Sequence, residues 1–218
     1  MKAFGNFMLL ATVSVMFFSC QKELSIDRSG SDGNPDENNG NTSIIGDWSF
    51  VAADMDVAVA GEATDITLGN VKFTNAFKTT TLNNKGSLKF TSTDFQSTNL
   101  SYSVSTNIQV ITTIPGFPPD VESIPFNFDM PASNSSGKYQ QIGNDSLYFP
   151  DGTFISVPEA SGGVPSSVSG GPGGARFSIV SDTLKIFGGI DTTSVEQVQG
   201  LLFSVKQKSS VVLKYKKK

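Results

Sequence analysis

The stretch Leu100–Ile114, "LSYSVSTNIQVITTI", alternates between apolar and polar side chains along most of its length. One parity carries the apolar side chains of Leu100, Tyr102, Val104, Ile108, Val110 and Ile114. The other parity carries the polar side chains of Ser101, Ser103, Ser105, Asn107 and Gln109. Because successive side chains of a strand point to opposite faces of a sheet, this alternation predicts a long strand with one buried face.

The same period of two recurs in shorter runs on both sides of this stretch. These runs include "VKFTNAF" from Val71, "SLKFTS" from Ser87, "IPFNFDM" from Ile124, "ARFSIV" from Ala175, "TLKIFGG" from Thr183 and "VVLKYKKK" from Val211. About eleven strand candidates follow residue 44, with Gly, Pro, Asn and Asp at the turns between them. The capping-box pattern at 194–198 predicts a helix of at most one or two turns. Such a chain predicts an all-β fold, either an antiparallel up-and-down β-barrel or a β-sandwich.

Two local features predict where the strands bend or lie at an edge. In "GDWSFVAADMDVAV" the apolar parity of Trp48 and Phe50 gives way, near 52–53, to the opposite parity of Met55 and Val57. A switch of this kind predicts a β-bulge, which lets a strand bend. Pro125 has no N–H to donate, so its strand is predicted to run along an edge or to contain a bulge.

The start of the chain contains the single cysteine, Cys20, and the chain has no histidine. Lys2 precedes the apolar run "FMLLATVSVMFF" (7–18), which is about half of the roughly 20 residues that a membrane-spanning helix needs. A basic start and a short apolar core are typical of a secretory signal peptide. Ser19-Cys20 at the end of that core resembles the lipobox of bacterial lipoproteins.

The resemblance implies that residues 1–19 are a lipoprotein signal peptide and that Cys20 carries the lipid at the new N-terminus. Several acyl chains on one cysteine hold a protein firmly at a membrane, whereas a single chain gives marginal anchoring. The partner implied for this end of the chain is therefore the membrane, reached through lipidated Cys20. Two alternatives stay open, namely an uncleaved membrane anchor and a buried structural cysteine.

Residues 20–43 form a polar segment, "CQKELSIDRSGSDGNPDENNGNTS", with few apolar side chains. Such a composition cannot bury enough surface to offset the entropy of ordering, so a flexible tether is expected. Gln21-Lys22-Glu23 is similar to an export signal of Gram-negative lipoproteins that reach the outer face of the outer membrane. It is equally compatible with an ordinary polar linker, so an outer-membrane, lipid-anchored protein is expected at either the periplasmic or the extracellular face.

Gly46-Asp47-Trp48 at the first strand resembles the G-x-W motif of lipocalins, and the later strand order is similar to lipocalin-like domains of Gram-negative lipoproteins. The resemblance covers residues 44–218 and implies a barrel. It also implies that Trp48 plugs one end and packs against a basic side chain, here Lys214 or Lys216. A core tryptophan without such a role is the alternative. The candidate interior residues of the barrel are Phe73, Phe90, Tyr102, Ile108, Phe126 and Phe128.

An aromatic interior suits a small apolar ligand and suits a packed, ligand-free core equally well. The rival hypothesis is a surface β-sandwich that binds glycans or partner proteins through loops 114–120 and 161–175. Phe117 in "IPGFPPD" is a candidate exposed aromatic for that role. The Gly-rich stretch 161–175 lacks the Lys of a phosphate-binding P-loop.

The composition excludes several classes of function. Without histidine there is no Ser-His-Asp or Cys-His nucleophile and no imidazole ligand for a metal. The net charge of −4 argues against a nucleic-acid partner, which requires a basic face. We therefore expect a protein that is not an enzyme and that has no catalytic residues, no metal site and no cofactor.

Overall fold

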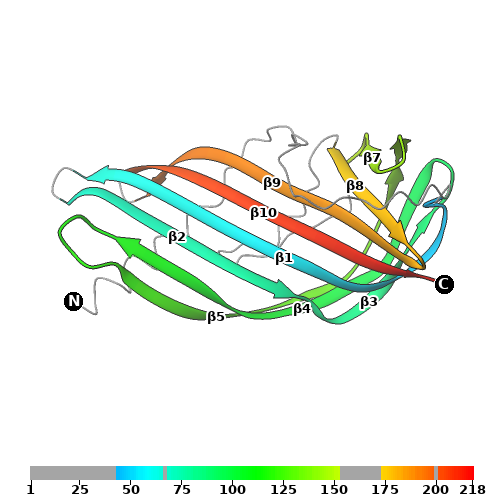
Figure 1. The fold of residues 1–218 in the computed structure, drawn as a ribbon, viewed down its shortest axis with the longest axis horizontal. Helices are drawn as coiled ribbons and strands as arrows, with labels where there is room; N and C mark the ends of the chain where they lie inside the picture. The colour runs from blue at the N-terminus through cyan, green and yellow to red at the C-terminus, as the bar shows by residue number, and fades with distance from the viewer. Residues whose placement is uncertain (1–42, 66–67, 153–172, 199–200) are drawn as a thin grey trace.

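The computed structural model describes residues 43–65, 68–152, 173–198 and 201–218, apart from the side chains of residues 196 and 198. Within these ranges the chain is all-β, with no helix, and the strands pair in antiparallel fashion (Figure 1). The expected signal peptide, Cys20 and the tether up to residue 42 lie outside the described residues. The strands are β1 (Gly46–Asp65), β2 (Gly69–Thr80), β3 (Leu82–Phe90), β4 (Asp94–Thr113), β5 (Asp120–Lys138), β6 (Gln140–Ile142), β7 (Ser146–Phe149), β8 (Gly173–Val180), β9 (Thr183–Val198) and β10 (Leu201–Lys217).

The described strands form one sheet in which most strands pair with a neighbour in the chain. β4 pairs with β5 on one side and with both β2 and β3 on the other. β2 and β3 in turn pair with the C-terminal and N-terminal parts of β1. β10, β9, β8, β7 and β6 follow on the other side of β1. The result is an up-and-down antiparallel sheet whose first long strand, β1, pairs with its last, β10.

A short break separates β2 from β3, although both run along the same edge of β1. Thr81 lies in the break, where its N–H donates to the Ala53 carbonyl (2.9 Å) and its hydroxyl oxygen accepts from the Ala53 N–H (2.8 Å). Gly86 has φ +115, and a Cβ there would lie 2.7 Å from the Cα of Leu100. The close approach of β4 to β3 at this position, within β3, therefore requires a glycine.

The predicted bends and edges agree with the structure. The register of β1 on β10 shifts between Phe50 and Ala52, which is where the parity of the apolar side chains changes. Pro125 lies in β5 and pairs with Asn107 of β4, and the described residues give this part of β5 no partner on its other side. The bulge is confirmed, and within the described residues Pro125 lies where β5 has a single neighbouring strand.

Two sequence predictions are wrong. The segment 194–198 is not a short helix but the end of β9, where Val195 pairs with Ser204 of β10. β-Branched valines and a neighbouring strand outweigh the local capping pattern. The predicted loop 161–175 is also too long, because its last residues, Gly173 to Ala175, begin β8. The remainder of that loop lies outside the described residues.

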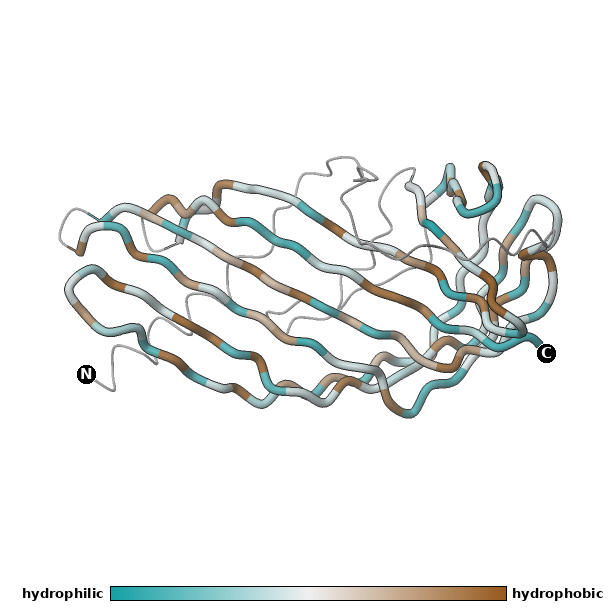
Figure 2. The backbone as a smooth tube through the Cα atoms, viewed as in Figure 1, coloured by the Kyte–Doolittle hydropathy of each residue, from teal (hydrophilic) through white to brown (hydrophobic). Residues whose placement is uncertain are grey.

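Side chains on one face of the sheet form the core, and we call this face the inner face. Hydrophobic and hydrophilic residues alternate along the strands in Figure 2, as the sequence predicts. A larger cluster contains side chains from β1, β2, β3, β4, β5, β7, β8, β9 and β10. A smaller cluster contains Val59, Ala63, Phe73, Phe203 and Val205. The long strands β1, β2, β9 and β10 run side by side, and β3, β7 and β8 gather at the end that carries the C-terminus (Figure 1).

Candidate functional site

The inner face of the sheet is the candidate functional site, because the charged side chains gather on the opposite, outer face. Ion pairs between neighbouring strands cover the outer face, including Lys78–Asp56 (2.7 Å) and Lys72–Glu62 (3.5 Å). Both of these pairs join residues that are directly opposite each other on β1 and β2. Exposed pairs of this kind contribute little to stability. The inner face carries most of the aromatic and aliphatic side chains.

The structure brings most of the sequence-predicted interior residues together. Phe90, Tyr102, Ile108 and Phe126 are buried in the larger cluster, and partly buried Phe128 packs against it. Phe73 is instead in the smaller cluster, where its ring contacts that of Phe203 at a centroid distance of 5.7 Å. The six residues thus line two separate parts of the inner face.

Trp48 is buried at the end of the sheet where β10 finishes. Its indole N–H donates to the carbonyl of Ile44 (2.9 Å), and the side chain is 1% exposed. The ammonium of Lys217 lies 5.8 Å from the centre of the indole ring, within the range of a cation–π contact. Lys217 is also the residue directly opposite Trp48 in the pairing of β1 with β10.

The two lysines expected beside Trp48 make other contacts. Lys214 forms an ion pair with Asp54, and Lys216 forms one with Asp182 (3.4 Å), both on the outer face. Their even positions on β10 point outward, whereas Lys217 shares the parity of the buried residues Leu213 and Tyr215. Strand parity is the signal that identifies Lys217 in the sequence.

The buried hydroxyl groups of Tyr102 and Tyr215 in the larger cluster have no hydrogen-bond partner, and neither has that of buried Ser97. The rings of Tyr102 and Tyr215 lie on either side of the same residue, Phe50, at centroid distances of 6.3 and 5.4 Å. Burial raises the pKa of Tyr102 to about 12 and also raises that of Tyr215. Both phenols therefore stay neutral at physiological pH. A buried hydroxyl with no partner costs about 1–3 kcal/mol, so these groups call for a water or a ligand.

Polar residues also lie farther along the inner face, between the two clusters. Directly opposite residues on neighbouring strands share a face of the sheet, and the pairings place Glu122, Val110, Asn75, Val59, Gln207 and Thr192 in one row. Ser209 lies two residues beyond Gln207 on β10 and is 4% exposed. Neither Asn75 Oδ1 nor Ser209 Oγ has a hydrogen-bond partner. We call Glu122, Asn75, Gln207, Thr192 and Ser209 the polar belt.

Sequence reasoning missed the polar belt, although the alternation contains a signal for it. Asn75 occupies the parity of Val71, Phe73 and Phe77, and Ser209 occupies that of Val205 and Val211. A polar residue in an otherwise apolar parity marks a position where the buried face has a hydrogen-bonding group. Such interruptions are therefore worth reading as candidate binding positions.

The loop between β4 and β5 carries the exposed aromatic that the rival hypothesis requires. Phe117 is 59% exposed, and its N–H donates to the carbonyl of Ile114 (3.1 Å) across the turn. Pro115 lies beside Gly69, so this loop and the β1–β2 turn are neighbours. The second loop of that hypothesis, 161–172, lies outside the described residues.

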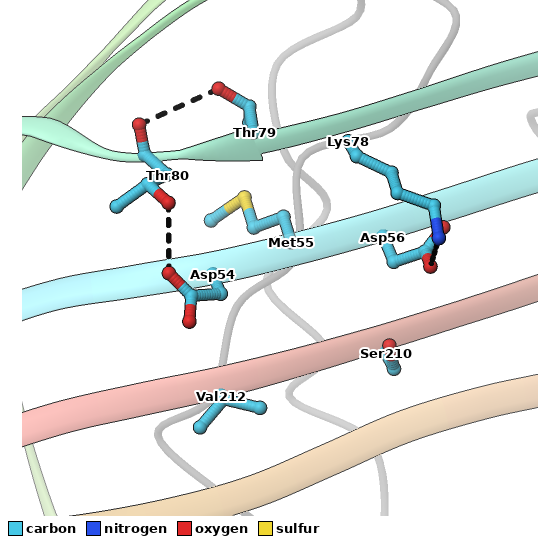
Figure 3. A pocket seen from close by; sticks show the side chains of 8 residues that line it. All are labelled: Asp54, Met55, Asp56, Lys78, Thr79, Thr80, Ser210 and Val212. Atoms are coloured by element: carbon cyan, nitrogen blue, oxygen red, sulfur yellow. Dashed lines mark hydrogen bonds and ion pairs between the residues drawn. The ribbon is translucent and has the colours of Figure 1, made fainter.

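A shallow hollow of about 410 Å³ lies over β1, β2 and β10, and Figure 3 shows the side chains that line it. Asp54 and Asp56 in the hollow are held by Thr80 and Lys78 respectively. A hydrogen bond from Lys214 lowers the pKa of Asp54 below its usual value. Because these polar groups already satisfy one another, the hollow leaves few of them free for a ligand.

Neither a metal centre nor a membrane-spanning helix is found in the described part of the chain. Within these residues no group of three or more acidic side chains lies close enough together to hold a metal ion. No helix within them is long and apolar enough to cross a bilayer. Comparison with family models, curated proteins and solved structures found no match to the sequence.

Proposed function

We propose that the protein is a lipid-anchored, lipocalin-like barrel that binds a small, mostly apolar molecule on its inner face and has no catalytic activity. Lipidation of Cys20 would hold it at the outer membrane, on the periplasmic or the extracellular side. The polar tether would separate the barrel from the lipid headgroups. The observation that carries the proposal is an aromatic inner face that contains buried hydroxyl and amide groups with no protein partner.

The strand pairings support a closed barrel. β6 follows β5 after one residue, Tyr139, so β5 and β6 continue in one direction along the chain. β5 pairs with β4 and β6 pairs with β7, which links one end of the strand order to the other. Phe95 of β4 also makes an edge-on ring contact with Phe149 of β7 (5.4 Å), although these two strands are not paired. Up-and-down barrels close in this way, although the part of β5 around Pro125 has only β4 as a neighbour within the described residues.

The rival function is a surface module that binds glycans or partner proteins. Phe117 supports it, because an exposed aromatic on a loop with three prolines can stack on a sugar ring or enter a pocket of a partner. A sandwich consists of two sheets, whereas all the described strands belong to one hydrogen-bonded sheet. The pairing therefore favours the barrel as the architecture.

The test is native mass spectrometry of the full chain, extracted in detergent from the membranes of its own cells. We expect the mass of the lipidated protein together with that of a bound small molecule. The molecule should be lost when the protein is denatured. A native mass equal to the denatured mass, with no dissociable component, would contradict the ligand-binding proposal.

The anchor is tested separately by Cys20→Ser, with Ser25→Ala in the tether as a control. We expect Cys20→Ser to abolish lipid attachment and to release the protein from the membrane fraction. Ser25→Ala should behave like the wild type. Retention of lipid on the Cys20→Ser chain would show that the lipoprotein assignment is wrong.

A further inference from the structure

The polar belt marks the boundary between the two apolar clusters of the inner face. Along β1, Val57 belongs to the larger cluster and Val59, two residues later, belongs to the smaller one. Val57 is directly opposite Ser209, and Val59 is directly opposite Asn75. The two unpartnered polar atoms therefore flank β1 at the point where one cluster ends and the other begins.

The inner face at this boundary has no basic side chain. The described lysines and Arg176 are on the outer face or at strand ends, and Lys217 reaches the inner parity only beside Trp48. A buried carboxylate or phosphate without a cation or several donors costs several kcal/mol.

A cationic head group is also a poor match for the two unpartnered atoms. Glu122 is on β5, and β4 lies between it and Asn75 on β2. With neighbouring strands about 4.8 Å apart, Glu122 is about 10 Å from Asn75 along the sheet, and Ser209 is farther still. A cation at Asn75 and Ser209 would therefore have no carboxylate in contact.

We propose that the polar belt binds the head group of an uncharged amphiphile that carries more than one hydroxyl, of the monoacylglycerol type. Asn75 Oδ1 accepts from one hydroxyl, and the Ser209 hydroxyl pairs with another. Asn75 and Ser209 are two strands and two residues apart, so their side chains start about 12 Å apart on the sheet. They therefore suit a head group with two polar atoms better than one with a single atom. The acyl chain packs on Phe73, Phe203 and Val205 of the smaller cluster. This inference rests on the proposed ligand-binding function.

The test compares three probes that share a ten-carbon chain: 1-decanoylglycerol, decanoate and decyltrimethylammonium. The detergent-extracted full chain is titrated with each probe at pH 8, and native mass spectrometry gives the bound fraction at each concentration. We expect 1-decanoylglycerol to bind at least about tenfold more tightly than either ion, because the ions lose their hydration without gaining a partner. If either ion bound more tightly, the inference of an uncharged head group would be wrong, whereas the proposed ligand-binding function would still hold. Failure of all three probes to bind would contradict the proposed function itself.

Two single variants test the belt residues independently, and each leaves the other residue in place. Ser209→Ala and Asn75→Leu should each weaken binding of 1-decanoylglycerol by about 2- to 12-fold, which is the loss expected for one hydrogen bond. Ser210→Ala is the matched control, because Ser210 is the next residue on β10 and lines the outer hollow. Thermal unfolding of each variant shows whether it is folded. Equal binding by folded Ser209→Ala and Ser210→Ala chains would place the glyceride elsewhere and overturn the inference.

Discussion

Gly61 lies beneath the ring of Phe73, the residue directly opposite it on β2. A Cβ on Gly61 would be 2.2 Å from the Cε1 atom of that ring. The ring uses this space to reach Phe203, so the glycine allows the aromatic contact that builds the smaller cluster. Phe95 and Gly137 are also directly opposite each other, and a Cβ on Gly137 would be 3.0 Å from the Phe95 ring. An aromatic ring folded over a cross-strand glycine is a known way of stabilising a sheet.

Gly61→Val should destabilise the protein, because the ring of Phe73 has to leave its packed position. Overfilling a packed site costs about 1–3 kcal/mol, and the free energy of unfolding measured in urea should fall by that amount. The control is Ala60→Val, on the neighbouring exposed position of β1. An equal effect of the two substitutions would show that the Phe73 ring does not depend on the space above Gly61.

The buried tyrosines give stability a dependence on alkaline pH. Burial raises the pKa of Tyr102 to about 12 and raises the pKa values of Tyr215 and Tyr139, the last with help from Asp94. In the unfolded chain a tyrosine ionises near pH 10, so between about pH 10 and 12 the unfolded state binds fewer protons than the folded state. The stability that the buried tyrosines contribute is complete below about pH 10 and is lost as the pH rises through their pKa values in the folded state.

The measurement is urea unfolding at several pH values from 8 to 12, with tyrosinate absorbance followed in parallel. We expect the free energy of unfolding to decrease above about pH 10. The tyrosinate absorbance of the folded protein should rise at a higher pH than that of the unfolded protein. Tyr215→Phe should make the decrease shallower. A decrease of the same steepness in Tyr215→Phe would contradict a buried, neutral phenol at this position.

At the scale of the strand, β2 and β3 follow one another along β1, and Thr81 occupies the break between them. Besides its two hydrogen bonds to Ala53, Thr81 donates its hydroxyl to Asn84 Oδ1 (2.6 Å) and accepts from the Asn84 side-chain N–H at its carbonyl (3.0 Å). Thr81 is 3% exposed, so a lost partner there is not replaced by bulk water. This one side chain satisfies polar groups on both sides of the bend.

Thr81→Val keeps the shape of the side chain and removes its hydroxyl. The Ala53 N–H then has no acceptor, and we expect the free energy of unfolding to fall by about 1–3 kcal/mol. Thr74→Val, at an exposed position of β2, is the matched control and should change stability by less than about 0.5 kcal/mol. Hydrogen exchange at the Ala53 amide should accelerate in Thr81→Val alone, and unchanged exchange would refute the role of the hydroxyl.

The elements also show what the sequence can and cannot predict. The alternation predicts most of β4, because one buried face requires a period of two, but the predicted strand begins at Leu100 whereas β4 begins at Asp94. The parity switch likewise predicts the bulge at Phe50/Ala52. The end of β9 was predicted wrongly, because a capping box is a local signal and the pairing with β10 is not. Parity marks Lys217, Asn75 and Ser209 as inward-facing positions, but which residues lie beside them depends on the strand pairing, which the sequence does not contain.

At the scale of the molecule, the contact between Phe95 and Phe149 joins strands from opposite ends of the strand order. The rings meet edge-on, with centroids 5.4 Å apart and planes at 89°. An edge-to-face pair of buried rings contributes about 0.5–1.5 kcal/mol beyond its burial. In a closed barrel this energy couples β4 to β7, whereas in an open sheet the two strands would be far apart.

A double-mutant cycle measures this coupling, with Phe95→Leu and Phe149→Leu made singly and together. We expect the two losses in the free energy of unfolding to be non-additive by about 0.5–1.5 kcal/mol. The control cycle pairs Phe149→Leu with Phe73→Leu, because Phe73 belongs to the other cluster, and there the losses should add within about 0.5 kcal/mol. Leucine keeps most of the buried surface, so each variant should remain folded. Additive losses in both cycles would mean that β4 and β7 do not share a core in solution, and the proposed closure of the barrel would fail with them.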